Sequence, residues 1–429
     1  MKTPPIVSPE EWRAAREQLL GKEKEVSRAR DALAAERRRM PWLAVDKEYW
    51  FEGPAGRVSL AGLFEGRRQL IVYRAFYGPE VTTYAEGGSY PERACVGCSL
   101  GADQVAHPGH LHARNTTLAF ASRAPQAEIR RLKERHGWNH IPWYTLTDDF
   151  DKDFDVDEWH GTNAFIREGD RVFRTYFINN RGDEQMGSTW NYLDITALGR
   201  QEAWEDSPEE WRVAREQLLV KEKELTRARD ALAAERRRMP WLEVDKEYWF
   251  EGPAGRVSLA GLFEGRRQLI VYRAFYGPEV TTYAEGGSYP ERACVGCSFG
   301  ADQVAHPGHL HARNTTLAFA SRAPQAEIQG LKERHGWNHI PWYTITDDFD
   351  KDFGVDEWHG TNAFIREGDR VFRTYFIDSR GDEQMGNTWN YLDITALGRQ
   401  EAWEDSPEGY PQTPPYQWWN YHDVHDTAK

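Results

Sequence analysis

The spacing of apolar residues predicts that the chain begins with a long helix. Residues 9–40 have no internal proline and are rich in Ala, Glu, Arg and Leu. Ser8, followed three residues later by Glu11, forms the capping box expected at the start of such a helix. An apolar residue recurs at every seventh position, at Trp12, Leu19, Val26, Leu33 and Met40. This narrow stripe fits a helix lying on its own domain and equally one that pairs with a second helix.

Shorter apolar runs after this helix predict alternating strands and helices. Strands are expected over residues 69–76, 117–122 and 143–147, and a hairpin over residues 162–167 and 172–178. Helices are expected over residues 95–106 and 125–135. Strands that alternate with helices in this way indicate the α/β class.

The same pattern occurs twice. Residues 8–205 recur as residues 207–404 with 13 substitutions, at a constant offset of 199. This period is too long for a solenoid, so we infer a tandem duplication of a complete folding unit. The predicted domains are residues 8–206, with a helix at 9–40 and a core at 41–200, and residues 207–429, with a helix at 208–239, a core at 240–399 and a tail at 406–429. Their near-identity favours packing of the repeats as an internal pseudo-dimer.

Only the second repeat is followed by a tail, which includes Trp418, Trp419, Tyr421 and His422. The first repeat instead passes directly from Glu205 into the helix of the second. If the tail contributes to a site, only one of the two sites has a tail of its own. The sequence leaves open whether this asymmetry is functional or a scar of unequal duplication.

The composition and net charge of the chain argue against some kinds of binding partner. The chain has 54 basic and 68 acidic residues, a net charge of −14, which argues against binding to a nucleic-acid backbone. Its 18 Trp, 19 Tyr and 19 Phe argue for folded cores. The apolar runs are too short to cross a membrane, and the first residues lack the pattern of a signal peptide. We therefore expect no membrane partner and a cytoplasmic location.

All four cysteines lie in two copies of one motif, Cys95-Val-Gly-Cys98 and Cys294-Val-Gly-Cys297. The motif follows a buried strand and opens a helix, where free N–H groups and the helix dipole stabilise a thiolate. A Cys-x-x-Cys motif beside a βαβ pattern is typical of thioredoxin-like redox proteins. The prediction is an α/β fold of two tandem thioredoxin-like domains, each preceded by a long helix. Each would be a thiol–disulfide oxidoreductase, in which the first cysteine attacks and the second resolves the mixed disulfide.

A related hypothesis is a thiol peroxidase. Pro91-x-x-x-Cys95-x-x-Cys98 has the spacing of the peroxiredoxin site, with Cys95 in place of its threonine. In that scheme Cys98 attacks peroxide and Cys95 resolves. The remaining alternative is a pair of inert, half-buried cysteines.

Several short motifs resemble a bacterial family of unknown function that is regarded as thioredoxin-like and as dithiol–disulfide oxidoreductases. They are Met40-Pro41-Trp42, residues 45–49 and 69–73, Cys95-x-x-Cys98-Ser99, residues 122–125, Gly137-Trp138, residues 191–194 and the tail Trp419 to Asp423. The similarity extends over nearly all of each repeat. It implies a thioredoxin-like fold and a redox role for the two cysteines. The duplication and the number of histidines depart from the family pattern.

Each repeat holds six histidines, and thiolate with imidazole suits copper or zinc. The alternative function is therefore a metalloprotein, a copper- or zinc-binding oxidase or carrier that uses the cysteines with clustered histidines. The candidate ligands are His107, His110, His112, His136 and His140, with His306, His309, His311, His335 and His339. His110 and His112 flank Leu111 and would point to one side of an extended segment. Histidines without a ligand role remain the simpler alternative, and the dithiol needs no cofactor.

Two further groups complete the candidates. Tyr84, Tyr90 and Arg93, repeated as Tyr283, Tyr289 and Arg292, lie in a loop before the cysteines that could shape a pocket for a small-molecule or protein disulfide or thiol substrate. The alternating aspartates from Asp149 to Asp157 lack the glycine and glutamate of a calcium loop, so a solvated acidic loop is expected. A third hypothesis is a non-catalytic interaction module that binds through its helices.

Overall fold

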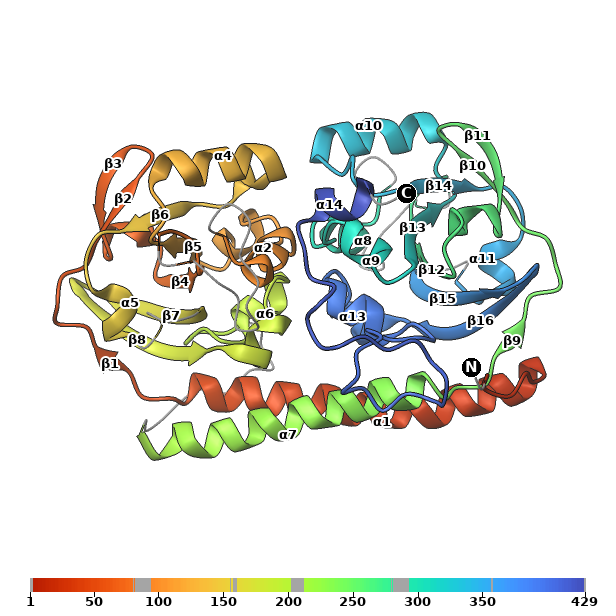
Figure 1. Cartoon of the computed structure of the whole chain (residues 1–429), viewed down its shortest axis with the longest axis horizontal. Coiled ribbons are helices and arrows are strands. Elements are labelled where there is room, and N and C mark those ends of the chain that lie inside the picture. Colours follow the sequence, from red (N-terminus) through yellow and green to blue (C-terminus); the bar gives the residue numbers. More distant parts are fainter. Residues whose placement is uncertain are drawn as a thin grey trace. The chain divides into compact units, whose positions relative to one another are not determined.

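The computed structural model describes residues 3–79, 81, 94–154, 156, 160–201, 212–278, 280, 293–355 and 358–427, with side chains of 212–217, 424, 426 and 427 left aside. The chain forms two compact units (Figure 1). The first-repeat unit consists of Arg28–Arg227 and Trp419–Asp423, and the second-repeat unit of Met1–Ser27, Ala228–Trp418 and Val424–Lys429. No helix among the described residues is long and apolar enough to cross a membrane.

The first-repeat unit contains one eight-stranded mixed sheet with strand order β1-β8-β7-β4-β5-β6-β2-β3. Its strands are β1 (Leu43–Ala44), β2 (Trp50–Gly53), β3 (Gly56–Ser59), β4 (Gln69–Arg74), β5 (Thr116–Ser122), β6 (Trp143–Leu146), β7 (Gly161–Glu168) and β8 (Arg171–Ile178). Its helices are α2 (Val96–Asp103), α3 (Gly109–His112), α4 (Gln126–His136), α5 (Phe150–Asp153) and α6 (Thr189–Leu193). The predicted central strands, the hairpin and the mixed α/β class are confirmed.

The second-repeat unit repeats this sheet in the order β11-β10-β14-β13-β12-β15-β16-β9. Its strands are β9 (Leu242–Glu243), β10 (Trp249–Gly252), β11 (Gly255–Ser258), β12 (Gln268–Arg273), β13 (Thr315–Ser321), β14 (Trp342–Ile345), β15 (Gly360–Glu367) and β16 (Arg370–Ile377). Its helices are α8 (Val295–Ala301), α9 (Gly308–His311), α10 (Gln325–His335), α11 (Phe349–Asp352), α12 (Ser379–Asp382) and α13 (Thr388–Asp393). Strand β12 pairs in parallel with β13 and antiparallel with β15.

The central strand β4 is buried along its whole length, because both of its faces are covered. In β4, Ile71 and Tyr73 belong to one core, which also contains both cysteines, and Leu70 and Val72 belong to a core on the opposite face. A strand covered on both sides loses the usual alternation of apolar and polar residues. The dithiol therefore lies near the end of a strand that is buried on both faces.

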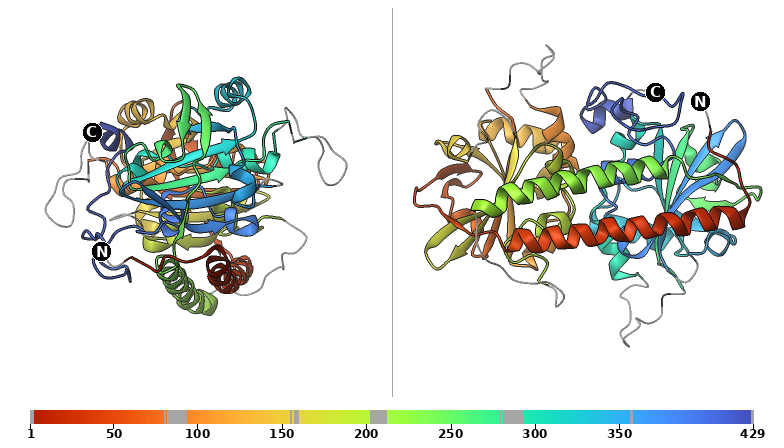
Figure 2. Two further views of the ribbon diagram at one scale, coloured as in Figure 1. Left: turned by 90° about the vertical axis from the view of Figure 1, so that its right-hand side faces the viewer. Right: turned by 90° about the horizontal axis from the view of Figure 1, so that it is seen from below.

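The two long helices, α1 (Pro9–Arg38) and α7 (Arg212–Arg236), are shared between the units (Figure 2). At the start of α1, Ser8 and Glu11 form the predicted capping box, with Ser8 N donating to Glu11 Oε2 at 3.0 Å. The first part of α1 packs in the second-repeat unit, where Arg16 Nε donates to Phe376 O at 2.6 Å. The last part belongs to the first-repeat unit, where Arg37 pairs with Glu222 of α7. Each core is thus completed by a helix segment from the other repeat. The remaining helix, α14 (His422–Thr427), follows the tail.

The acidic segment near Asp151 differs from the solvated loop that we expected. Asp151 is buried in α5 and pairs with Arg123 and with the fully buried Arg74. Asp153 accepts hydrogen bonds from Lys47 and from the hydroxyl of Tyr49. These aspartates hold α5 against the sheet, and Asp155 and Asp157 lie outside the described residues.

Candidate dithiol site

Each cysteine pair lies at the start of the short helix that is the next helix in the chain after the central strand. Cys95 is the residue before α2, and Cys98 lies one turn further on, with 4% and 1% of their surfaces exposed. The Phe76 N–H, just after β4, donates to Cys98 Sγ at 3.3 Å. In the second-repeat unit Phe275 N–H donates to Cys297 Sγ at the same distance. All four cysteines are free thiols.

A hydroxyl pair fixes the first turn of the helix. The Ser99 hydroxyl donates to the carbonyl of Cys95 at 2.9 Å and lies 2.7 Å from the hydroxyl of Tyr77. Ser298 and Tyr276 make the same contacts in the second-repeat unit. These bonds anchor the carbonyl of the first cysteine, so its sulfur is held at the start of the helix.

The two thiols of a pair have different pKa values because their surroundings differ. The hydrogen bond from Cys297, helped by the N–H groups of Cys297 and Gly296 and opposed by burial, lowers the pKa of Cys294 to about 6. Burial, together with that same hydrogen bond, raises the pKa of Cys297 well above its ordinary value. In the first-repeat unit burial likewise raises the pKa of Cys98. The first cysteine of the second repeat is therefore a thiolate at neutral pH beside a protonated partner.

A tyrosine, a histidine and an aspartate lie close to each dithiol. His359 Nδ1 lies 3.0 Å from Asp382 Oδ2, and the Thr361 hydroxyl donates to the other oxygen at 2.7 Å. Burial opposes the charge on His359, but the bond to Asp382 outweighs it and raises the pKa of His359. The ring of Tyr272 lies 6.2 Å from that of His359, and its hydroxyl bonds to Cys297.

The first-repeat unit has the same arrangement. His160 Nδ1 lies 3.1 Å from Asp183 Oδ2, and the rings of Tyr73 and His160 are 6.2 Å apart. Burial opposes the charge on His160, but its hydrogen bond to Asp183 raises the pKa of His160. The Tyr73 hydroxyl bonds to Cys98, and burial keeps that phenol protonated by raising its pKa.

Strand pairing explains why residues so far apart in sequence meet at the dithiol. Tyr73, near the end of β4, faces Thr162 at the start of β7, and Thr162 also faces Ile178 at the end of β8. The residue before β7, His160, and the turn after β8, which holds Asp183, therefore reach the end of β4. The sequence offered one signal for this residue: His160 lies two positions before residue 162, where the first predicted strand of the hairpin begins.

The candidate metal ligands occupy other places. His107 and His306 each accept a hydrogen bond from a backbone N–H two residues on, at 3.2 Å, and His140 and His339 lie 3.4 and 3.2 Å from the carbonyls of Val105 and Val304. His136 and His335 stack on the next tryptophan. The extended arrangement expected of His110 and His112 is wrong, because both lie on α3, as His309 and His311 lie on α9.

No group of three His, Cys, Asp or Glu side chains among the described residues is placed to hold a metal ion. Copper or zinc binding stays a prediction from the sequence, which elemental analysis of the purified protein would test. The pocket candidates Tyr84, Tyr90, Arg93, Tyr283, Tyr289 and Arg292 lie outside the described residues.

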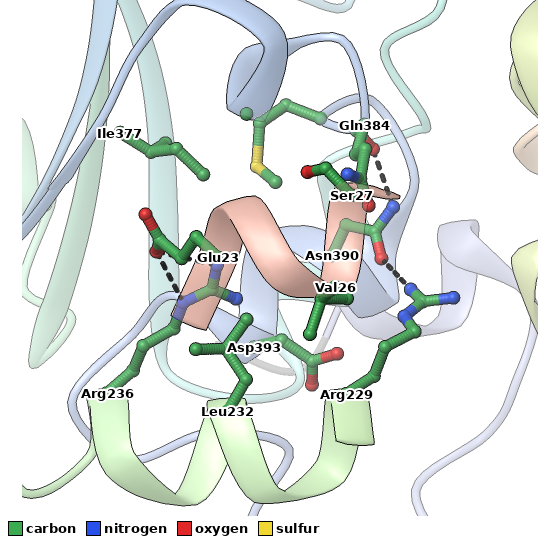
Figure 3. Close-up of a pocket in the computed structure, with 12 residues that line it drawn as sticks. Glu23, Val26, Ser27, Arg229, Leu232, Arg236, Ile377, Gln384, Asn390 and Asp393 are labelled. Carbon is green, nitrogen blue, oxygen red and sulfur yellow. Dashed lines mark hydrogen bonds and ion pairs between the residues drawn. The ribbon is translucent and has the colours of Figure 1, made fainter. Parts of the chain in front are cut away.

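A cavity of about 40 Å³ lies among α1, α7 and α13 of the second-repeat unit (Figure 3). Ion pairs and hydrogen bonds close its walls: Arg236 donates to Glu23 at 2.9 Å, and Arg229 to Asn390 at 2.8 Å. A space of this size holds only about one to three water molecules. None of its lining residues belongs to the dithiol, so we regard it as a packing cavity of the helix contact.

Fold and site together define a duplicated α/β protein with a Cys-x-x-Cys dithiol at the end of each central strand. The chain belongs to the family described as bacterial protein of unknown function (DUF899), whose model matches residues 1–208 and again residues 205–425. No curated protein matches the chain. One solved structure that matches is from a study of a disulfide switch in BsSco, a member of the Sco family of cytochrome c oxidase assembly proteins. It is 13% identical, covers 32% of this chain and 87% of that chain, and has a TM-score of 0.19, too low to carry an argument.

Proposed function

We propose that the protein is a thiol–disulfide oxidoreductase of thioredoxin-like fold. The observation that carries this proposal is the unequal pair of thiols, with the pKa of Cys294 lowered to about 6 and that of Cys297 raised. A low pKa on the first cysteine makes it a nucleophile at neutral pH, and a high pKa keeps the second cysteine in reserve. The parallel strands β12 and β13 on either side of α8 support the thioredoxin-like assignment.

The reaction begins when the Cys294 thiolate attacks a sulfur of a substrate disulfide. A mixed disulfide forms, and the other substrate sulfur leaves as a thiolate that takes a proton from solvent. Cys297 then loses its proton and attacks Cys294 Sγ, which releases the second substrate sulfur as a thiolate, and this thiolate takes up a proton equivalent to the one that Cys297 lost. The substrate gains two electrons and two protons, and the protein is left with a Cys294–Cys297 disulfide. An external thiol reductant must restore the dithiol.

The second step requires that Cys297 ionise after the first is complete. Once Cys294 is in a mixed disulfide, its negative charge no longer raises the pKa of Cys297. The hydroxyl of Tyr272 and the N–H of Phe275 then remain as donors to the sulfur. We assign Tyr272 to stabilising the resolving thiolate, and His359 to stabilising the attacking thiolate by its positive charge.

The peroxidase variant of this function is less well supported. It requires Cys98 or Cys297 to be the attacking thiolate, whereas burial raises the pKa of both. It would also leave the low pKa of Cys294 without a use. We therefore assign attack to the first cysteine of each pair.

The test is reduction of a disulfide substrate by variants of the full chain, with dithiothreitol as the reductant. Replacing Cys95 and Cys294 together by Ser should abolish activity, because the attacking cysteine of each pair is then missing. In a separate incubation without dithiothreitol, Cys297→Ser should instead trap a mixed disulfide on Cys294, visible as added mass under nonreducing conditions. Activity retained by the double variant would overturn the proposal.

A further inference from the structure

Residues 419–423 of the tail, here called the strap, lie against the start of α2 in the first-repeat unit. Gly97 lies between the two cysteines, and a Cβ atom added to it would stand 2.7 Å from Trp419 Cζ3, which is closer than real side chains approach. The same Cβ atom would stand 3.7 Å from Cys95 Sγ. A single methyl group there would touch both the indole and the sulfur, so the ring edge of Trp419 lies beside Cys95.

Tyr421 anchors the strap in the core of the unit. It is 1% exposed and belongs to the core cluster that contains both cysteines of the first repeat. Its ring stacks on His136, with ring centres 4.6 Å apart and planes 13° from parallel, and the guanidinium of Arg135 lies 5.5 Å from the centre of the same ring. Burial and ring contacts of this kind hold an aromatic side chain firmly. Because Tyr421 is two residues from Trp419, its burial fixes where the indole lies.

Two polar contacts hold the end of the strap. His422 Nδ1 lies 2.9 Å from Asp103 Oδ1, an oxygen that also accepts a hydrogen bond from the indole N–H of Trp138 at 2.7 Å. Arg135 Nε donates to Asp423 Oδ2 at 3.0 Å. Asp103 is the last residue of α2, and Arg135 lies in α4. The strap is therefore fastened to two helices of the first-repeat unit as well as to its core.

The strap also approaches the hydroxyl pair that fixes the first turn of α2. Burial, together with the nearby phenol of Tyr421, raises the pKa of Tyr77 well above its ordinary value. The Tyr77 hydroxyl lies 2.7 Å from that of Ser99, which donates to the carbonyl of Cys95. The strap thus has one ring beside the sulfur of Cys95 and a second ring near the bonds that hold its carbonyl.

The position of the indole bears on which disulfides can react with Cys95. Exchange begins when the thiolate attacks a substrate sulfur, so the atoms attached to that sulfur must fit around Cys95. Cys95 is 4% exposed with the strap in place. A small disulfide brings few atoms to this point, whereas a protein disulfide brings folded chain on both sides of its sulfur. A steric clash with one class of substrate is a common source of specificity.

We infer that Trp419 is a specificity-determining residue of the first-repeat dithiol and restricts Cys95 to small disulfides while the strap is in place. A protein disulfide reacts there only in the fraction of molecules whose strap has left α2, and its rate falls by that fraction. This inference rests on the proposed function, because it names the substrate class of the same dithiol.

Access to Cys95 is measured first, by labelling the reduced full chain with N-ethylmaleimide and with a maleimide on a polyethylene glycol chain. Mass spectrometry of the Cys95 peptide gives both rates. Trp419→Ala should raise the ratio of the large reagent's rate to the small reagent's rate at least about tenfold, as expected if the strap is open in less than about a tenth of molecules. Trp419→Phe, the matched control, keeps a ring on Gly97 and should retain the low ratio.

A second variant reaches the same end by another route. Gly97→Ala keeps the whole tail but leaves no room for the indole, so it should also raise the ratio. Circular dichroism and thermal unfolding identify the variants that fold, and one folded variant of the two is enough for the test. A ratio that stays at the value of the unmodified chain in a folded Trp419→Ala or Gly97→Ala variant would overturn the inference.

The substrate class is tested with Cys294 and Cys297 both replaced by Ser, so that only the first-repeat dithiol remains. With dithiothreitol as the reductant and the rate without protein subtracted, we expect reduction of oxidised glutathione. Trp419→Ala should raise the ratio of kcat/KM for insulin to kcat/KM for oxidised glutathione at least about tenfold.

The two proposals fail separately in these experiments. If neither disulfide is reduced but labelling responds as expected, the proposed function is refuted and the strap is confirmed as a barrier to large molecules. If both disulfides are reduced and Trp419→Ala leaves the ratio of kcat/KM values unchanged, only the role of Trp419 is refuted.

Discussion

The lowered pKa of Cys294 makes a quantitative prediction about its reactivity. The ordinary value for a thiol is 9.0, and the surroundings of Cys294 lower its pKa to about 6. Its rate of alkylation by iodoacetamide should therefore rise with a midpoint near pH 6 and reach a plateau above about pH 7. The largest cause is the hydrogen bond from Cys297, so Cys297→Ala should move the midpoint toward 9.

The size of the effect follows from two opposing factors. At pH 6, about half of a thiol of pKa 6 is ionised, against about 0.1% of a thiol of pKa 9, a ratio of about 500. The nucleophilicity of a thiolate falls as its pKa falls, with a Brønsted coefficient of about 0.4–0.5. A pKa lower by three units therefore reduces the rate constant of the thiolate about 20-fold. Cys294 should thus react about 20-fold faster than an ordinary thiol at pH 6, and only about fourfold faster at pH 7.

The assay is peptide mass spectrometry of the alkylated chain between pH 4.5 and 9, which follows Cys294 separately from Cys95. Cys297→Ser is the matched control, because its hydroxyl still donates a hydrogen bond, and its midpoint should lie between those of the unmodified chain and Cys297→Ala. A midpoint above pH 8 in the unmodified chain would refute the reasoning. So would a midpoint that Cys297→Ala does not raise.

Three further predictions concern stability and the site. Asp194→Asn should destabilise the chain by about 3–5 kcal/mol in urea, because it leaves Arg200 buried without its partner. Burial opposes ionisation of Asp194, but Arg200 lowers its pKa below the ordinary value of 3.8, so this stabilisation is complete above about pH 4 and is lost as pH falls further. Ser8→Ala removes the capping box and should cost about 1 kcal/mol, seen as a lower melting temperature; an unchanged value would contradict it. His359→Gln should raise the alkylation midpoint of Cys294, and an equal or lower midpoint would exclude a role for its charge.

The elements of the fold that follow from local sequence were predicted well. The central strand β4 was evident because an apolar run of that length, bounded by polar residues, has few other solutions. The β7–β8 hairpin followed from two runs separated by Glu168-Gly169-Asp170. The β2–β3 hairpin was missed, although Pro54-Ala55, flanked by Gly53 and Gly56, separates its two four-residue strands. Such short strands carry too few alternating positions to stand out.

The site was predicted only as far as its sequence motif. Cys95 and Cys98 were predicted as site residues because they form a motif of four consecutive residues. Tyr73 was not, since a tyrosine in a buried strand is more often a core residue, and Asp183 lies in a polar turn after β8 that resembles any other. What brings them together is the antiparallel pairing of β4, β7 and β8, and register cannot be derived from an apolar pattern alone.

The shared helices show a second kind of information that local sequence does not contain. The stripe on residues 9–40 correctly identifies the buried side of α1, with Trp12, Leu19 and Leu33 at 5% exposure or less. Nearly the same stripe recurs in α7, so it cannot specify which core each half of a helix covers. Leu33 of α1 and Leu218 of α7 join one core with Cys95 and Cys98, although they come from different repeats. The dithiol of the first repeat is therefore enclosed in part by a residue that the duplication supplied from the second.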